Sequence, residues 1–206
     1  MLDFDGPVCS VFSNFSPHAV ARELRACLTL DTAPETNEPF ELLRYVARHE
    51  PSAAVRAESE LARLETVAVR TAVPTPGAGA VLRHFAASSR PVVIVSNNSS
   101  SAVRAYLSLH GLAHLVAGVS SRTGPEPGLL KPHPYLLQRA AEMVSATTND
   151  CLMVGDSATD IEAAHAAGSL SVGYANKPGK RERFKRLGAD AIIDTMPELL
   201  GTCAPT

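Results

Sequence analysis

The second part of the chain alternates short apolar runs with segments of helical periodicity, and this alternation constrains the fold more than any other feature. The predicted strands are RPVVIVS, LVAGVS, CLMVGD, LSVGY and ADAIID, which begin at residues 90, 115, 151, 170 and 189. Helical segments such as AVRAYLSLHG and ATDIEAAHAAG separate the strands, and each of these two ends in a glycine. Strands and helices in alternation predict an α/β fold in which helices cover both faces of a parallel sheet.

The segment between residues 14 and 73 differs, because its periodicity is helical throughout. Ser16 and Pro17 begin a first helical stretch, EPFELLRYVARHE forms a second, and SAAVRAESELARLETVAVRTAV forms a third. The sequence PTPGAG at residues 74–79 then breaks the pattern. We therefore expect an α/β core domain built from residues 1–13 and 74–206, with residues 14–73 inserted as a helical domain.

The charge balance excludes a chain-wide attraction to nucleic acid or to an anionic membrane. The 206 residues include 19 Lys and Arg against 21 Asp and Glu, a formal net charge of −2 at pH 7. Six cations do gather in KPGKRERFKR at residues 177–186, and we expect them to form the solvated face of a late helix. We accordingly expect neither nucleic acid nor a membrane among the partners of this chain.

Two further absences in the sequence bear on its surroundings. No apolar run approaches the roughly 20 residues that span a bilayer, and no basic and apolar leader is visible at the N-terminus. Cys9, Cys27, Cys151 and Cys203 lie far apart, with no C-x-x-C pair that would indicate a metal site or a disulfide framework. We expect reduced thiols in a soluble, cytoplasmic protein.

Polar side chains follow the predicted strands at the points where these strands end. Ligands of parallel sheets bind at the carboxyl ends of the strands, and these ends share one edge of the sheet. The residues expected at this edge are Asp3 and Asp5 after Leu2, Ser96, Asn97 and Asn98 after VVIV, and Asp156, Ser157 and Asp160 after LMVG. The sequence therefore predicts a site that several separate segments build together.

The chemistry of these residue types points to phosphoryl transfer. Clustered carboxylates raise one another's pKa unless a cation lies among them, and an all-oxygen cluster is the usual setting for Mg²⁺. We expect a helix to begin at residues 97–101, where free N–H groups suit an anion, and Lys131 to supply an ammonium group. An aspartate beside a metal and such cations can form an aspartyl phosphate.

Four motifs, taken in order, resemble those of the haloacid dehalogenase (HAD) superfamily, in the subgroup similar to phosphoglycolate phosphatases. They are the D-x-D-G of residues 3–6, Ser96 after an apolar strand, Lys131 before proline, and the G-D-S-x-x-D-I-x-A-A-x-x-A-G of residues 155–168. The fourth motif is the most specific. The resemblance covers residues 1–12 and about 74–195. It implies a Rossmann-like parallel sheet of order 5-4-1-2-3, with residues 14–73 as an α-helical cap.

The resemblance also implies a role for each matched residue. Asp3 would attack phosphorus, and Asp5 would protonate the leaving oxygen and then activate water. Ser96 and Lys131 would hold phosphoryl oxygens, and we assign Asn97 to the same phosphate site. Asp3, the backbone carbonyl of Asp5, and Asp156 would bind Mg²⁺, with Asp160 in support. Because a halide leaves without a proton, the second acid favours a phosphatase over a dehalogenase.

The expected function is Mg²⁺-dependent hydrolysis of a small phosphorylated metabolite by a monomer or homodimer. Two alternatives stay open, a sugar-phosphate mutase on the same fold and a non-catalytic protein that kept the fold. The insert matches no motif, so the substrate is not readable from the sequence, although Arg44, Tyr45 and Arg48 are candidate contacts.

The first strand is short at its start, since only Met1 and Leu2 precede Asp3. A mean strand of roughly 5–6 residues would extend upstream of residue 1. We still expect Asp3 to end the central strand, because residues 92–95 and 151–155 supply neighbours of full length on both sides.

Overall fold

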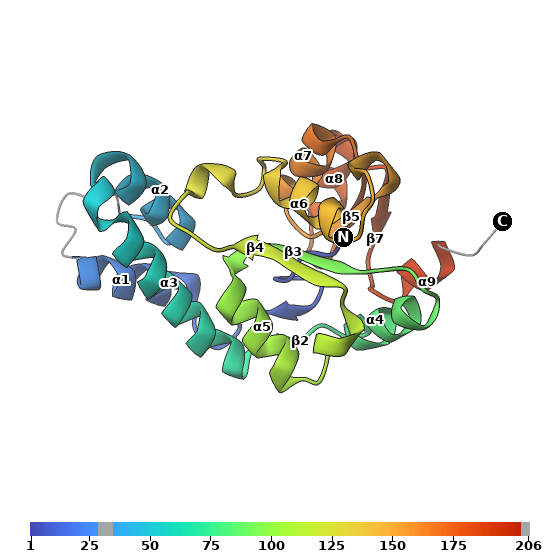
Figure 1. The fold of residues 1–206 in the computed structure, drawn as a ribbon, viewed down its shortest axis with the longest axis horizontal. Helices are drawn as coiled ribbons and strands as arrows, with labels where there is room; N and C mark the ends of the chain where they lie inside the picture. The colour runs from blue at the N-terminus through green and yellow to red at the C-terminus, as the bar shows by residue number, and fades with distance from the viewer. Residues whose placement is uncertain (29–34, 203–206) are drawn as a thin grey trace.

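A computed structural model of the chain describes residues 1–28 and 35–202. Figure 1 shows three helices, α1 to α3, at one end of the molecule and the strands with the remaining helices at the other. This second part has the predicted α/β architecture, and its sheet determines where the candidate site lies.

The central sheet consists of parallel strands, and residues 1–3 join its two halves. On one side β3 (Val93–Ser99) pairs with β4 (Gly118–Arg122), and on the other β5 (Leu152–Gly155) pairs with β6 (Leu170–Tyr174) and β6 with β7 (Ala191–Ile193). Leu2 forms bridges to Ile94 and to Val154. Its N–H donates to the carbonyl of Val93 at 3.0 Å, and the N–H of Asp3 donates to that of Val154 at 2.9 Å. The predicted strand order is confirmed, with β7 as an additional strand beside β6.

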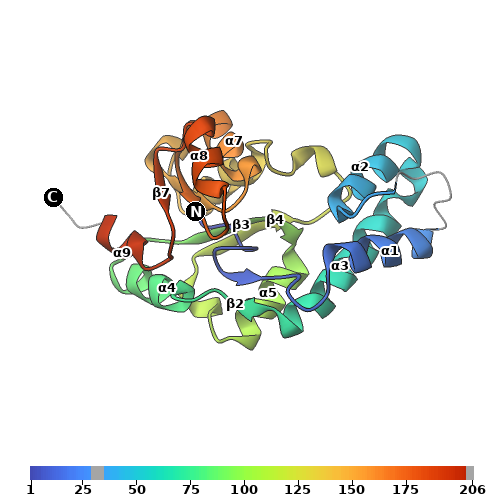
Figure 2. The same cartoon turned by 180° about the vertical axis from the view of Figure 1, so that it is seen from behind.

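Helices cover both faces of this sheet. Successive residues of a strand point to opposite sides, so both faces present apolar side chains against which helices pack. Ile94 and Val154 belong to one apolar cluster, which Tyr106 of α5 and Leu82 of α4 complete. Val95 belongs to a second cluster, together with residues of α6 and α7. Figure 2 shows the two layers from behind. The helices of this part are α4 (Ala78–Ala87), α5 (Ser100–Leu109), α6 (Tyr135–Met143), α7 (Ala158–Ala167), α8 (Lys180–Leu187) and α9 (Glu198–Thr202).

One predicted helix start is confirmed, and one predicted strand start is wrong. The helix expected to begin within residues 97–101 begins at Ser100, since β3 continues in extended conformation to Ser99, whose side chain caps the helix by accepting from the N–H of Ala102. The strand expected from residue 115 begins at Gly118, since a 3-10 turn, Ala113–Leu115, precedes it. Further 3-10 turns are Pro51–Ala53, Val69–Thr71, Pro127–Leu129 and Thr148–Asp150.

The helical insert consists of α1 (Pro17–Leu28), α2 (Pro39–His49) and α3 (Ala54–Ala68). A proline opens each of the first two helices, where its missing N–H costs nothing. The three helices share an apolar cluster of their own, formed by Leu24, Leu42 and Leu61 among others. A short antiparallel pair, β1 (Cys9–Ser10) with β2 (Val73–Pro74), brings the chain entering the insert beside the chain leaving it. The division into a core of 1–13 and 74–206 and a cap of 14–73 stays a prediction.

Within the described ranges, no helix combines the length and the apolarity needed to cross a membrane. Cys9, Cys27 and Cys151 are free thiols, and Cys203 lies outside the described residues.

Candidate active site

The carboxyl ends of the strands and the insert together line a pocket of about 320 Å³. Its lining residues are Asp3, Asp5, Ser96, Asn97, Asn98, Lys131, Asp156, Ser157 and Thr159 from the α/β part, and Glu38, Phe40, Glu41 and Arg44 from the insert. All the candidate residues that sequence reasoning placed at this edge except Asp160 therefore line one pocket, and Asp160 lies directly behind it.

Asp3 lies between β3 and β5 with its side chain nearly buried. One carboxylate oxygen, Oδ1, accepts the N–H of Phe4 at 2.7 Å and lies 2.8 Å from the ammonium of Lys131. Burial and the neighbouring Asp160 carboxylate raise the pKa of Asp3 well above its usual value, and Lys131 opposes this rise. Both contacts engage the same oxygen, so the second oxygen of Asp3 is available for chemistry.

Lys131 is a buried cation held by three oxygens. Its Nζ lies 2.6 Å from Asp160, 2.8 Å from Asp3 and 3.0 Å from the carbonyl of Val95. Burial favours the neutral amine, but the two carboxylates outweigh it and raise the pKa of Lys131. The lysine therefore presents a fixed positive charge beside Asp3.

Asp160 is fully buried, and each of its carboxylate oxygens already has a partner. Oδ1 pairs with Lys131, and Oδ2 accepts the N–H of Ser157 at 2.9 Å and its hydroxyl at 2.6 Å. This contact is the N-terminal cap of α7, which the fourth motif provides locally. Asp160 thus anchors the lysine and the strand-to-helix turn, and its expected support of a bound metal ion stays a prediction.

Asp156 follows β5 and faces the loop of residues 3–6. A Cβ on Gly6, which has φ +105°, would lie 2.3 Å from the Asp156 carboxyl carbon, so a side chain at that position would displace the acid. Oδ2 of Asp156 pairs with Lys180 at 2.5 Å and accepts from Asn176 at 3.1 Å. Sequence reasoning missed both partners.

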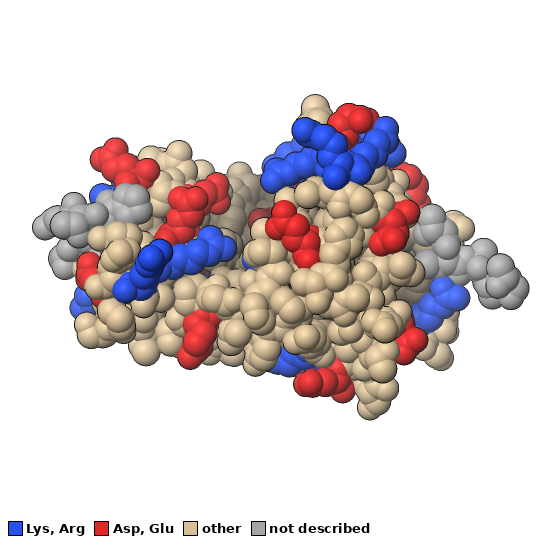
Figure 3. Space-filling model, turned by 90° about the horizontal axis from the view of Figure 1, so that it is seen from above, with Lys and Arg blue, Asp and Glu red and all other residues tan. Residues whose placement is uncertain are grey.

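Lys180 is the first residue of α8, the helix whose cations were expected only to face solvent. Figure 3 shows Lys and Arg side chains gathered over the end of the molecule where α8 lies. Arg181 and Lys185 pair with Asp194 and Glu182 on this exposed surface, in agreement with the expectation. Lys180 instead reaches inward, and the expectation was wrong for that residue because helix position alone does not show which cation contacts the site.

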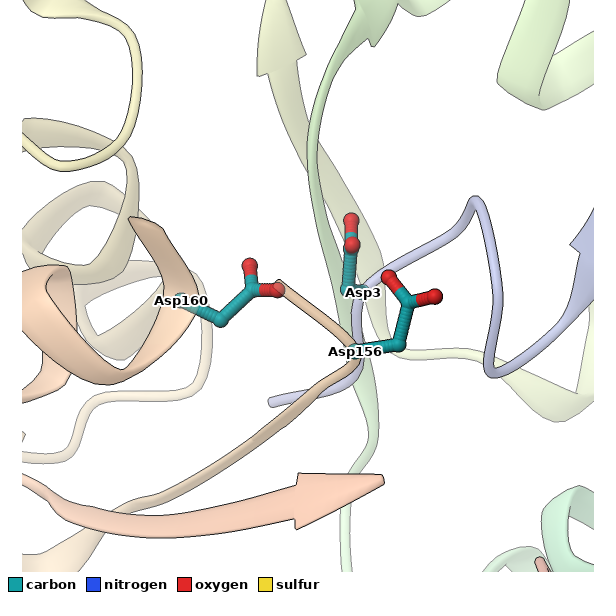
Figure 4. A group of neighbouring side chains, drawn as sticks. All are labelled: Asp3, Asp156 and Asp160. Carbon is teal, nitrogen blue, oxygen red and sulfur yellow. The ribbon is translucent and has the colours of Figure 1, made fainter. Parts of the chain in front are cut away.

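Three carboxylates lie close enough together to bind one metal ion. Asp3, Asp156 and Asp160 each offer a ligand atom, and these atoms all lie within 4.8 Å of one another. Figure 4 shows the three side chains beside one another, with Asp3 on the N-terminal segment and Asp156 and Asp160 on the stretch that runs from β5 into α7. An all-oxygen donor set of this kind fits a hard cation such as Mg²⁺.

The side chain of Asp5 lies outside this group of three. It accepts the N–H of Val11 at 2.9 Å, and burial raises its pKa to about 6. A carboxyl group with this pKa can donate or accept a proton near neutral pH. The expected metal contact of Asp5 through its backbone carbonyl stays a prediction.

Side-chain hydrogen bonds hold the end of β3, residues 96–99, in place. The buried hydroxyl of Ser96 accepts the N–H of Asn98 at 3.1 Å. The side chain of Asn97 binds the backbone of Lys131 twice, since Oδ1 accepts its N–H at 2.8 Å and Nδ2 donates to its carbonyl at 3.1 Å. Asn97 therefore clamps the lysine loop with its amide, whereas sequence reasoning had expected it at a helix start. Its contact with phosphate stays a prediction.

Helix α2 of the insert contributes to the lining of the pocket. Phe40 and Arg44 lie in its lining, whereas Tyr45 stacks on His49 at 4.6 Å along the same helix. Sequence reasoning also missed Glu65 and Arg122, which contact the end of β3.

The chain is similar to known proteins in sequence and in fold. A family model described as haloacid dehalogenase-like hydrolase matches residues 11–168, which include Ser96, Lys131 and Asp156, whereas Asp3 and Asp5 precede the matched range. The chain is 36% identical over 121 residues to the phosphoglycolate phosphatase of Neisseria gonorrhoeae, a match that covers 56% of this chain and 49% of that protein. It is 29% identical over 173 residues to the phosphoglycolate phosphatase of Rhodospirillum rubrum, a match that covers 82% of this chain and 63% of that protein. The chain thus spans about half to two thirds of the length of these relatives.

Solved structures share the fold over nearly the whole chain. CbbY from Rhodobacter sphaeroides in complex with phosphate superimposes with a TM-score of 0.74 at 18% identity, covering 96% of this chain and 94% of that one. A hydrolase from Pseudomonas syringae superimposes with a TM-score of 0.73 at 20% identity, covering 98% of this chain and 94% of that one. At these identities the likeness establishes the architecture alone.

Proposed function

The chain belongs to the haloacid dehalogenase-like hydrolases, and we propose that it is a Mg²⁺-dependent phosphatase acting on a small phosphate monoester. The observation that carries this proposal is the pairing of Asp3 with the buried ammonium of Lys131 at 2.8 Å, at the edge where Asp5 and Asp156 also lie. A nucleophilic carboxylate, a fixed cation and a proton-exchanging acid are the groups that phosphoryl transfer through an aspartyl phosphate requires.

In the proposed first step, the carboxylate of Asp3 attacks phosphorus and the bond from phosphorus to the ester oxygen breaks. Asp5 donates its proton to that leaving oxygen, and the alcohol departs. The ammonium of Lys131 balances negative charge on the phosphoryl oxygens, and Ser96 donates a hydrogen bond to one of them.

In the proposed second step, water attacks the phosphoryl group on Asp3, and Asp5 takes the proton that the water loses. Inorganic phosphate and the free carboxylate of Asp3 result. Mg²⁺, held by Asp3 and Asp156 with Asp160 in support, would supply Lewis-acid stabilisation of the phosphoryl charge when bound.

The pocket supports a small substrate, since its volume is about 320 Å³ and α2 of the insert covers it. The relatives named above are phosphoglycolate phosphatases. Phosphoglycolate is therefore the first substrate to test, followed by other phosphorylated metabolites of similar size.

The test measures release of inorganic phosphate from p-nitrophenyl phosphate and from phosphoglycolate, with Mg²⁺ and with EDTA. We expect turnover that EDTA removes and added Mg²⁺ restores. Asp3→Asn should abolish turnover while circular dichroism shows an unchanged fold, because an amide cannot form the phosphoenzyme. Phosphate release by Asp3→Asn at most of the parent rate would disprove the covalent mechanism, and a sugar phosphate isomerised without phosphate release would favour the mutase.

A further inference from the structure

A buried ion-pair network joins helix α3 of the insert to the carboxyl end of β4. The guanidinium of Arg122, the last residue of β4, lies 2.6 Å from Glu65 and 2.7 Å from Glu58, both on α3. The side chains of Arg122 and Glu65 are 1% and 0% exposed. Charges removed from water so completely persist only where hydrogen bonds satisfy them, so the network holds α3 and β4 in one defined relation.

Glu65 also holds the end of β3. One of its carboxylate oxygens accepts the side-chain N–H of Asn98 at 3.1 Å, and the other accepts the backbone N–H of Ser99 at 2.8 Å. Asn98 in turn contacts the hydroxyl of Ser96, which the proposed function assigns to phosphate. The insert therefore contacts the proposed phosphate-binding end of β3 through the carboxylate of Glu65.

Arg122, at the end of β4, also contacts the end of β3. Its Nε donates to the backbone carbonyl of Asn97 at 3.1 Å. The side chain of Asn97 then holds the backbone of Lys131 by two hydrogen bonds, and the ammonium of Lys131 lies beside Asp3. A continuous series of hydrogen bonds thus runs from α3 to the lysine at the nucleophile.

We propose that Glu65 and Arg122 are positioning residues that set the geometry of Lys131 and of the end of β3, residues 96–99, where the proposed function places phosphate. This proposal rests on the phosphatase function proposed above, because it concerns how that pocket holds a phosphoryl group. The planar guanidinium of Arg122 binds Glu58, Glu65 and the carbonyl of Asn97 at the same time. A lysine ammonium cannot reproduce this geometry. Neither residue touches the reacting atoms, so both act through Asn97, Asn98 and Lys131.

The experiment measures the affinity for tungstate, an oxyanion shaped like a phosphoryl group, by calorimetry in the presence of Mg²⁺. The first variant is Glu65→Gln, which keeps the shape of the side chain and removes its negative charge. The second is Arg122→Lys, which keeps the positive charge and removes the planar guanidinium with its several N–H donors. Arg139→Gln is the matched control, because Arg139 donates from α6 to the carbonyl of Ser121, the neighbour of Arg122 in β4. All three changes affect side chains beside the same strand end.

We expect both test variants to bind tungstate about tenfold more weakly and to lose kcat toward p-nitrophenyl phosphate, since small displacements of binding groups cost about this much or more. The control should change tungstate affinity by no more than about twofold. Removing one partner of a buried ion pair strongly destabilises a protein, so affinity is measured at a temperature where circular dichroism shows each variant folded. The double variant of Glu65→Gln with Arg122→Gln should fold more stably than Arg122→Gln alone, which leaves the buried Glu65 carboxylate without its cation, and it should still bind tungstate weakly.

Parent-like tungstate affinity in folded Arg122→Lys or Glu65→Gln would overturn the positioning role, as would an equal loss in Arg139→Gln. Failure of the proposed function has a different signature. In that case the parent protein itself neither binds tungstate nor releases phosphate, and the positioning role falls with the function.

Discussion

An apolar extension placed before Met1 should stabilise the protein, because the sheet has an open position there. A mostly apolar pocket of about 410 Å³ lies at the opposite end of the sheet from Asp3, and Leu2, Val93 and Leu152 are among its lining residues. The carbonyls of Val93 and Leu152 accept from the nitrogens of Leu2 and Met1 at 3.0 and 2.8 Å. The N–H of a strand residue points to the same side as its carbonyl, so the N–H groups of Val93 and Leu152 face this open position.

The size of the effect follows from what an added strand segment would bury. Three apolar side chains contribute about 1.5–3 kcal/mol each when they leave water. Ordering three residues costs about 1–2 kcal/mol each in backbone entropy and a further fraction in side-chain entropy. Two or three ladder hydrogen bonds add about 1 kcal/mol each. With each contribution near the middle of its range, the balance is a net gain of about 1–3 kcal/mol in the free energy of unfolding.

The assay compares two extensions of equal length, Met-Val-Ile-Val and Met-Ser-Gly-Ser, each placed before Met1. For a chain of this size, 1 kcal/mol shifts the melting temperature by roughly 2–4 °C, so the apolar extension should raise Tm by about 2–12 °C over the polar one. The Mg²⁺ requirement should not change, because the extension enters at the end of the sheet opposite the carboxylates. An apolar extension that melts with or below the polar one would show that residues 1–3 do not continue as the central strand, and the structural argument for Asp3 as nucleophile would fail.

Three further predictions concern the site. Asp5→Asn should lose more activity toward an alkyl phosphate than toward p-nitrophenyl phosphate, because phenolate departs with little proton donation; equal losses in kcat on the two substrates would remove Asp5 from the acid role. Mg²⁺ and Mn²⁺ should support turnover whereas Ca²⁺ should inhibit it, since its larger coordination shell disturbs in-line attack; full turnover with Ca²⁺ alone would contradict the proposed site. Lys180→Met should tighten Mg²⁺ binding about threefold or more in a thermal-shift titration, since it removes a cation that lies 2.5 Å from Asp156; the exposed Lys185→Met is its control, and unchanged or weaker binding in Lys180→Met alone would refute this reasoning.

Much of the fold was predictable because its signals are local. Helical and strand periodicity, the prolines that open α1 and α2, and the glycines that end α7 and α8 each depend on residues a few positions apart. The approximate location of the site followed as well, because parallel strands bring their carboxyl ends to one edge and polar residues follow those ends. The capping contact between Ser157 and Asp160 lies within the fourth motif itself.

The exact end of β3 was not predictable from the same signals. Asn97, Asn98 and Ser99 all favour helix starts by residue type, and the sequence therefore predicted a start within residues 97–101 without selecting one position. In the structure β3 continues to Ser99, whose N–H bonds to Glu65, 34 positions away, and the helix begins at Ser100. A contact with a distant segment thus helps to select one of several locally favourable positions.

Sequence alone determined which carboxylates and cations are available, and the tertiary structure decided how they pair. Lys131 holds Asp3 and Asp160, Lys180 holds Asp156, and Arg122 holds Glu65, although the sequence offers 19 cations and no rule for choosing among them. Most of these pairs join segments tens of residues apart, and the choice depends on which side chains packing removes from water together. A buried charge is tolerated only beside its partner, so burial, a property of the folded chain as a whole, selected these pairs.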